Sequence, residues 1–256
     1  MQNISCCIVN LDDEKFPIDL KTPIFRVFEF EHFLSDIEEK RLTLVNVQKW
    51  IDVNEAALFR SSWSNDQGCA IQKENSLLKL FGLSWTLDGN CAGHWLGFSP
   101  SKNVVRIRVK TTLETLLQAV NFEKLGSNGA VLRAGKVGYL ADNEFCNLWD
   151  GGIKISELST LANWMKKGLL LKRDAYAYER EVRFMLYADN SGADDLFHCD
   201  LIKPSKETYE TIEISPYVCD CCKNHIRRKL RAFFAENQIC DSSLGKILVD
   251  GVEVGL

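Results

Sequence analysis

Residues 178–183 contain the acids and bases whose spacing could support chemistry. Glu179, Glu181 and Arg183 occur at every second position, and the residues at positions 182, 184 and 186 are apolar. This alternation is typical of a β-strand, in which successive side chains point to opposite faces of the sheet. If the strand starts at Glu179, two acids and one base share a face, and burying such charges beside an apolar core is costly. The pattern therefore predicts that this face is either solvated or a functional site.

Arg183 decides between two interpretations of this face. A tight ion pair between Arg183 and Glu181 would make the charges part of the architecture, whereas an Arg183 that points elsewhere would leave the carboxylates available for chemistry. One such chemistry is metal-dependent hydrolysis, because paired carboxylates hold magnesium. Asp52, Glu55 and Lys172 would complete the site of a metal-dependent nuclease.

The elements that must position these residues follow from hydrophobic periodicity. Period-two patterns and short apolar runs predict strands at residues 24–28, 42–47, 80–86, 103–109, 135–140 and 212–214, besides the strand that carries Glu181. Apolar residues at helical spacing predict helices at residues 30–37, 111–120, 158–169 and 226–234. Thr111 and Glu114 have the spacing of a capping box for the second of these helices.

The predicted strands outnumber the helices, and they cluster instead of alternating with them. This order favours a single α+β domain over a doubly wound sheet. We predict a mixed, mostly antiparallel split sheet flanked by helices over residues 23–256, preceded by an N-terminal arm or edge strand at residues 1–22. The sequence has no glycine-rich phosphate loop.

Composition restricts the classes of partner. The chain has 256 residues, 46% of them hydrophobic, and a net charge of −4, so it has no overall attraction to nucleic acid or to an anionic membrane. No apolar run approaches the roughly 20 residues that span a bilayer, and residues 1–5 lack the start of a secretory signal. The ten cysteines are therefore expected to be reduced and to serve as small core residues. These features predict a cytoplasmic protein.

A cysteine cluster near the C-terminus offers a further chemistry. Cys219, Cys221, Cys222 and His225 are ligands of the type that zinc prefers, and they lie within seven residues. Structural zinc sites usually draw on two separated pairs, and no second pair stands at convincing spacing. The alternative is the start of a helix that carries small apolar thiols, and we expect no bound metal.

The chain resembles a large bacterial family that is catalogued only as domain of unknown function 2971. The resemblance runs from about residue 24 to about residue 245, and it depends on Arg26, Asp52-Val53-Asn54-Glu55, Ser84-Trp85-Thr86, His94-Trp95-Leu96-Gly97-Phe98-Ser99, Lys172, Tyr178-Glu179-Arg180-Glu181-Val182-Arg183 and Ile214-Ser215-Pro216-Tyr217. The chain departs from the family pattern at Val53-Asn54, where proline and an aromatic residue are usual, at His94 and at Phe98. The cysteine cluster is not a family feature, and the resemblance implies a fold more than a function.

A more distant resemblance links the chain to ADP-ribosyltransferases of the Arg–Ser–Glu type. Those enzymes carry an arginine on an early strand, a Ser-x-Ser or Ser-x-Thr strand in mid-chain, and a Glu/Gln-x-Glu motif at a late strand. Arg26, Ser84-Trp85-Thr86 and Glu179-Arg180-Glu181 occur here in the same order.

This resemblance implies a role for each residue. Arg26 would bind a dinucleotide phosphate through its guanidinium group, and Ser84 would hold Glu181 in place. Glu181 would contact the nicotinamide ribose and stabilise an oxocarbenium-like transition state, while Glu179 would orient or deprotonate the acceptor. Four further side chains are implied in NAD binding: Trp85, Thr86, Trp95 and Phe98.

The implied function is that of an NAD-dependent ADP-ribosyltransferase-like protein. NAD would be its substrate, a protein or nucleic acid its unidentified acceptor, and no membrane would take part. Association at the level of the family adds a role as a toxin or in phage defence. Two alternatives stay open: a non-enzymatic binding or sensor module of the same fold, and the metal-dependent nuclease.

Overall fold

A computed structural model of the chain describes ten segments of the sequence. These segments are residues 18–50, 62–65, 67–70, 80–91, 93–97, 104–148, 153–154, 169–188, 194–249 and 252–255. The predicted N-terminal arm and the predicted helix at 158–169 lie almost entirely outside them, so both stay predictions.

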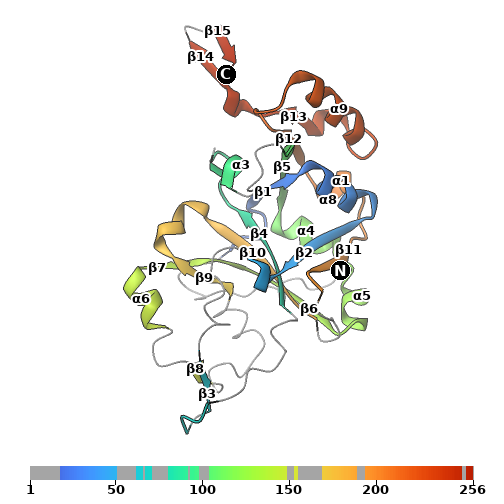
Figure 1. Ribbon diagram of the computed structural model, residues 1–256. Coiled ribbons are helices and arrows are strands. Elements are labelled where there is room, and N and C mark those ends of the chain that lie inside the picture. Colours follow the sequence, from blue (N-terminus) through green and yellow to red (C-terminus); the bar gives the residue numbers. More distant parts are fainter. Residues whose placement is uncertain are drawn as a thin grey trace. The chain divides into compact units, whose positions relative to one another are not determined.

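The chain divides into two compact units, each assembled from separate stretches of sequence. Figure 1 shows the helices and strands, coloured along the sequence. The first unit comprises Met1–Asp19, Thr43–Trp85 and Asn121–Cys199, and the second comprises Leu20–Leu42, Thr86–Val120 and Asp200–Leu256. The expectation of one domain over residues 23–256 stays a prediction.

The first unit contains a sheet whose strand order is β11-β2-β4-β10-β6. The pairs β2–β4 and β10–β6 are antiparallel, while two small sheets, β7–β9 and β3–β8, are parallel. Its elements are β2 (Arg41–Asn46), η2 (Val47–Lys49), β3 (Trp63–Ser64), β4 (Leu80–Thr86), α5 (Phe122–Ser127), β6 (Ala130–Lys136), β7 (Gly138–Leu140), α6 (Asp142–Asn147), β8 (Ile153–Lys154), β9 (Leu171–Arg173), η5 (Asp174–Glu179), β10 (Glu181–Ala188) and β11 (Leu196–Asp200).

The second unit is built on the strand order β1-β5-β12-β13, antiparallel except for the last pair. A separate hairpin, β14–β15, follows near the C-terminus. The elements are β1 (Pro23–Glu29), α1 (Phe30–Glu38), α3 (Gly93–Gly97), β5 (Arg106–Thr112), α4 (Leu113–Ala119), α8 (Ser205–Thr208), β12 (Thr211–Ile214), α9 (Asp220–Leu230), η6 (Glu236–Gln238), β13 (Ile239–Asp241), η7 (Ser243–Gly245), β14 (Lys246–Val249) and β15 (Val252–Gly255). The fold is thus of mixed α and β composition with mostly antiparallel sheets, as predicted.

The hydrophobic pattern placed several elements correctly. The strands expected at 24–28, 42–47, 80–86 and 212–214 correspond to β1, β2, β4 and β12, and the helix expected at 30–37 corresponds to α1. Phe30, Phe33, Leu34 and Ile37 are buried in α1, because residues three and four apart share one helix face.

Two predicted boundaries were wrong. The strand expected at 103–109 is β5, which continues to Thr112. Thr112 therefore takes the N-cap position of α4 in place of Thr111, and its hydroxyl accepts a hydrogen bond from the amide of Thr115 at 3.1 Å. The hydroxyl of Thr111 instead donates to the carbonyl of Thr208.

The strand expected at 135–140 is interrupted. Residues 130–136 form β6, which pairs along its length with β10, and residues 138–140 form β7, which pairs with β9. Val137 lies between them, and its amide donates to the carbonyl of Glu181 at 3.0 Å. The chain therefore leaves the main sheet of the first unit beside the start of β10.

No described helix is long and apolar enough to cross a membrane.

Gly82 of β4 leaves space for the ring of Trp50, both in the first unit. A Cβ at position 82 would collide with Cζ2 and Cη2 of that ring, the latter at 2.9 Å. We expect Gly82→Ala to lower the free energy of unfolding by about 1–3 kcal/mol, measured by urea denaturation, because the ring must move out of a packed position.

The matched control is Gly126→Ala in α5, where an added Cβ meets nothing within 4 Å. A helical alanine should leave stability unchanged or raise it by about 0.5–1 kcal/mol. Equal effects of the two substitutions would contradict the close contact between Gly82 and Trp50.

Candidate functional site

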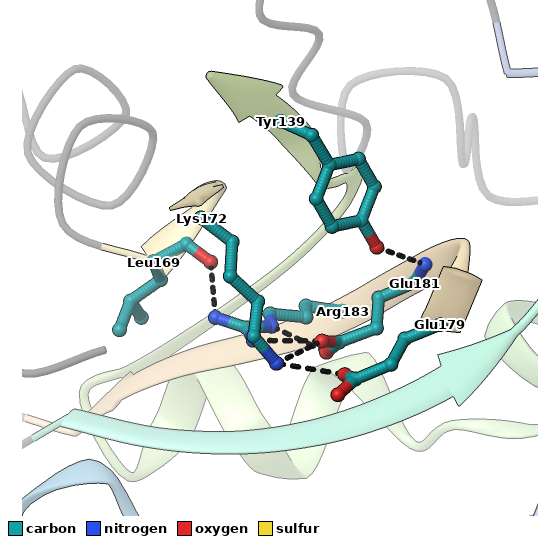
Figure 2. A network of polar contacts seen from close by, with 6 residues as sticks. All are labelled: Tyr139, Leu169, Lys172, Glu179, Glu181 and Arg183. Atoms are coloured by element: carbon teal, nitrogen blue, oxygen red, sulfur yellow. Dashed lines mark hydrogen bonds and ion pairs between the residues drawn. The ribbon is translucent and has the colours of Figure 1, made fainter. Parts of the chain in front are cut away.

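The candidate site of the first unit is centred on the carboxylate of Glu181, the first residue of β10. Glu181 is only 2% exposed. Its Oε1 accepts hydrogen bonds from Nζ of Lys172 at 2.8 Å and from Nη2 of Arg183 at 3.1 Å, and its Oε2 accepts one from Nε of Arg183 at 2.8 Å (Figure 2). Both carboxylate oxygens are therefore held by cations, which a buried carboxylate requires.

Arg183 is fixed from several sides. Its side chain is 1% exposed, Nη1 donates to the carbonyl of Leu169 at 2.8 Å, and the guanidinium carbon lies 4.7 Å from the ring centroid of Trp50. Of the two interpretations offered by the sequence, the structure shows the tight ion pair with Glu181. The charged face is therefore shielded from solvent, and the charges of Glu181 and Arg183 are paired with each other.

Strand β7 holds the backbone at the start of β10. The register of the parallel β7–β9 pair sets Tyr139 opposite Lys172. The hydroxyl of Tyr139 accepts a hydrogen bond from the amide of Glu181 at 2.8 Å, and Figure 2 shows this contact beside the ion pairs. Burial raises the pKa of Tyr139 to about 12, so the phenol stays protonated at neutral pH.

Glu179 approaches the same ammonium group from a different element. It is the last residue of the 3₁₀ helix η5, and β10 starts at Glu181, so the condition that the strand includes Glu179 is not met. Arg180 joins the two elements in the left-handed conformation, with φ of 45°. This turn lets Glu179 contact Nζ of Lys172 at 2.7 Å while Glu181 contacts the same atom at 2.8 Å.

The two carboxylates have different environments. The side chain of Glu179 is 16% exposed, against 3% for Glu181. Burial, together with a hydrogen bond to Glu181, raises the pKa of Glu179 to about 7. Burial would also raise the pKa of Glu181, but the charge of Arg183 and the hydrogen bonds from its neighbours outweigh this effect and lower the pKa well below the ordinary value.

This arrangement combines a permanently ionised acid with one that exchanges a proton near neutral pH. Environments that separate the pKa values of two adjacent carboxylates are typical of acid–base centres. Glu181 is a fixed negative charge, and Glu179 is the more accessible group that can accept or donate a proton.

Ser84 and Trp85 lie on β4, the strand next to β10 in the sheet of the first unit. Ser84 is half-buried, whereas Trp85 is 1% exposed and packs in the core. The structure thus brings the strand of Ser84 beside the strand of Glu181. Thr86 ends β4, and its hydroxyl accepts a hydrogen bond from the amide of Asp88 at 3.0 Å.

Arg26 and Trp95 belong to the second unit. Arg26 is half-buried on β1, opposite Val109 of β5, and its guanidinium carbon lies 5.1 Å from the ring centroid of Phe28. Trp95 of α3 is fully buried beside Arg108, and its carbonyl accepts a hydrogen bond from Arg106. The convergence of Arg26 with Ser84 and Glu181 stays a prediction.

Three other predicted site residues, Phe98, Asp52 and Glu55, lie outside the described segments. The nuclease arrangement that depends on Asp52 and Glu55 therefore stays a prediction as well.

Sequence reasoning missed Tyr139 and Trp50 as parts of the site. Tyr139 is 42 positions from Glu181 and contacts it through a phenol, and Trp50 covers Arg183 from a loop after η2. Neither residue stands in a motif that spacing could reveal. Lys172 was named from the sequence, as part of the possible nuclease site and of the family pattern.

Comparison of the chain with protein families, curated proteins and solved structures shows similarity only to solved structures. No family model matches the chain, so the resemblance to domain of unknown function 2971 stays a prediction. No curated protein matches it either.

Among solved structures, the chain is similar to three of DarT from Thermus sp. 2.9. The complex with ADP-ribosylated ssDNA is 9% identical, with a TM-score of 0.39, over 89% of this chain and 97% of that one. The complex with carba-NAD+ is 10% identical, with a TM-score of 0.37, over 88% and 97%. The complex with NAD+ is 8% identical, with a TM-score of 0.38, over 88% and 98%. At this level the likeness does not transfer an activity to this chain.

The ion network should dominate the stability of the first unit. We expect Arg183→Met to lower the free energy of unfolding by about 3–5 kcal/mol, because removing one partner leaves the buried carboxylate of Glu181 under-compensated. Urea denaturation followed by tryptophan fluorescence measures the effect.

Arg231→Met is the matched control. Arg231 also forms a two-pronged contact with a glutamate, Glu236, at 2.6 and 2.9 Å, but both side chains are exposed. Exposed pairs contribute little, so stability should hardly change. A loss for Arg183→Met no greater than that of the control would contradict the importance of burial.

The raised pKa of Glu179 predicts how stability depends on pH. Between its ordinary value of 4.5 and about 7, the folded chain binds a proton at Glu179 that the unfolded chain releases, so stability should fall as pH rises through this window. The lowered pKa of Glu181 acts only at lower pH. Urea midpoints at pH 5, 6, 7 and 8 measure the slope.

Glu179→Gln should flatten this decline, since the amide does not titrate. Glu236→Gln, at an exposed glutamate, should leave the slope as in the unmodified chain. Parallel curves for the unmodified chain and Glu179→Gln would show that Glu179 titrates normally.

Proposed function

We propose that this protein is an NAD-dependent ADP-ribosyltransferase-like enzyme with Glu179 and Glu181 at its acidic centre. The observation that supports this proposal most directly is the shared contact of both carboxylates with Lys172, at 2.7 and 2.8 Å, together with the ion pair between Glu181 and Arg183. The charge of Arg183 keeps Glu181 ionised, whereas burial raises the pKa of Glu179 to about 7. Cleavage of a glycosidic bond through an oxocarbenium-like transition state uses two such acids.

In this proposal Glu179 is the group that meets the acceptor. It is the more exposed of the two acids, and its pKa of about 7 suits a general base that removes a proton from the attacking nucleophile. Glu181 supplies fixed negative charge near the ribose. Arg26 would bind the pyrophosphate, and Ser84, Trp85, Thr86, Trp95 and Phe98 would complete the NAD site.

One observation favours a second candidate, a non-enzymatic binding module. Both oxygens of Glu181 are already occupied by Lys172 and Arg183, and the residue is 2% exposed. A protein that uses the network only as architecture would bind a nucleotide, or another ligand, without transferring anything. A role as a toxin or in phage defence is part of the proposal and needs its own test in cells.

Transfer from labelled NAD tests the proposal. The purified chain is incubated with labelled NAD and either cell lysate or single-stranded DNA, the nucleic acid that is ADP-ribosylated in one DarT structure. We expect label on a macromolecule, and a rate roughly 10²- to 10⁴-fold lower for Glu179→Gln because a general base is lost.

Glu236→Gln is the control, since it makes the same chemical change at an exposed glutamate of the second unit. Glu181→Gln is also examined, with circular dichroism to check that it folds, because the change alters a buried ion pair. NAD binding without transfer would favour the binding module, and equal rates for all variants would exclude the two acids from catalysis.

A further inference from the structure

Three thiols meet at the start of α9 in the second unit. Cys219 is the N-cap residue, and Cys221 and Cys222 lie in the first turn. The sulfur of Cys219 lies 2.8 Å from that of Cys221 and 3.2 Å from that of Cys222. Among the described residues, they form the one group of three or more cysteine, histidine and acidic side chains whose ligand atoms all lie within 4.8 Å of each other.

The exposure of these thiols does not fit core packing. Cys219 and Cys221 are exposed and Cys222 is half-buried. By contrast, Cys199, which packs in the core, has no exposed surface. The helix start expected here is confirmed, but the expectation that the cysteines are small core residues is wrong for this cluster. Convergent sulfurs that face solvent require another explanation.

We propose that Cys219, Cys221 and Cys222 bind one zinc ion. Sulfurs that each lie 2.3 Å from a tetrahedral zinc are about 3.8 Å apart, so the sulfurs must separate by only about 1 Å or less to admit the ion. Rotation about χ1 of exposed side chains at a helix start achieves such a shift. A set of three thiolates selects soft metal ions and disfavours magnesium and calcium.

In this proposal His225 is the fourth ligand, although it is not in the group whose ligand atoms lie within 4.8 Å of one another, so its ring must move toward the sulfurs. His225 follows Cys221 by four residues on α9, so the two side chains share one face of the helix. Both line a hollow of about 570 Å³ together with Asn224, Arg227, Arg228 and Arg231. Nδ1 of His225 lies 3.2 Å from Nη2 of Arg228. Arginine can only donate, so Nδ1 carries a lone pair, and a zinc ion that bound there would replace Arg228 as its partner.

The binding step requires no redox partner. Each of the three thiols loses its proton to solvent as its sulfur bonds to the ion, and neutral His225 contributes its lone pair without losing a proton. Three thiolates and Zn²⁺ have a net charge of −1, and the positive end of α9, a helix of eleven residues, stabilises that charge. The ion would join the loop before α9 to its first turn, a role independent of the acidic centre of the first unit.

Cobalt substitution tests this site. The full chain is freed of metal with a chelator, kept in a non-thiol reductant, and titrated with Co²⁺ as a spectroscopic probe for zinc. We expect a thiolate-to-cobalt absorption band in the near ultraviolet and tetrahedral bands in the visible range, saturating at one ion per chain. Added Zn²⁺ should abolish both.

Cys219→Ser combined with Cys222→Ser should weaken binding by more than about 100-fold, which exceeds the usual effect of losing an outer-shell partner. Cys69→Ser combined with Cys146→Ser removes two other exposed thiols and is the matched control, expected to leave the titration unchanged. Circular dichroism checks that both variants fold, and Cys221→Ser is a second ligand variant should the first pair fail to fold.

The absence of a thiolate band in the unmodified chain would overturn the proposal. An equal band in the cysteine variants of α9 and in the control would do so too, since the metal would then bind elsewhere. His225→Ala should keep the thiolate band and weaken binding; no weakening would show that water is the fourth ligand and overturn the assignment of His225.

Discussion

The buried ion network around Glu181 is the interaction on which the first unit depends. Transfer of a carboxylate into a protein interior costs several kcal/mol unless cations and hydrogen bonds replace its water. Lys172 and Arg183 meet this requirement at 2.8 Å each. Because Arg183 is fixed in turn by Leu169 and Trp50, the network joins β10 to the segment before β9 and to the loop after η2.

This requirement also explains the local backbone. Arg180 adopts a left-handed conformation, which is uncommon outside glycine and costs free energy. Arg180 is the single residue between the end of η5 and the start of β10, and its turn lets both Glu179 and Glu181 reach Lys172. The amide of Glu181 is satisfied by Tyr139, and its carbonyl by the amide of Val137. The strained turn is therefore held by contacts on both sides.

The network supports two roles that are not exclusive. As a structural element, it holds β7, β9 and β10 of the first unit around the buried carboxylate of Glu181. As chemistry, it leaves Glu179 able to exchange a proton, because Glu179 shares the ammonium group of Lys172 with Glu181, at 2.7 and 2.8 Å. The zinc site proposed at α9 is a different kind of feature, since its side chains are exposed and add nothing to the core.

The sequence by itself determined the main strands and the amphipathic α1, because hydrophobic periodicity is a local property. It also identified Glu179, Glu181 and Arg183 as charges that are costly to bury, and it named Lys172 as a candidate site residue. It misplaced the ends of β5 and β6, since strand ends depend on which neighbours are available for pairing. Only the tertiary structure decided that Arg183 pairs with Glu181 and that Tyr139, 42 positions away, accepts its amide. The sequence could not predict the difference in pKa between Glu179 and Glu181 either, because the effect of burial on a pKa depends on the side chains that surround the group in the folded protein.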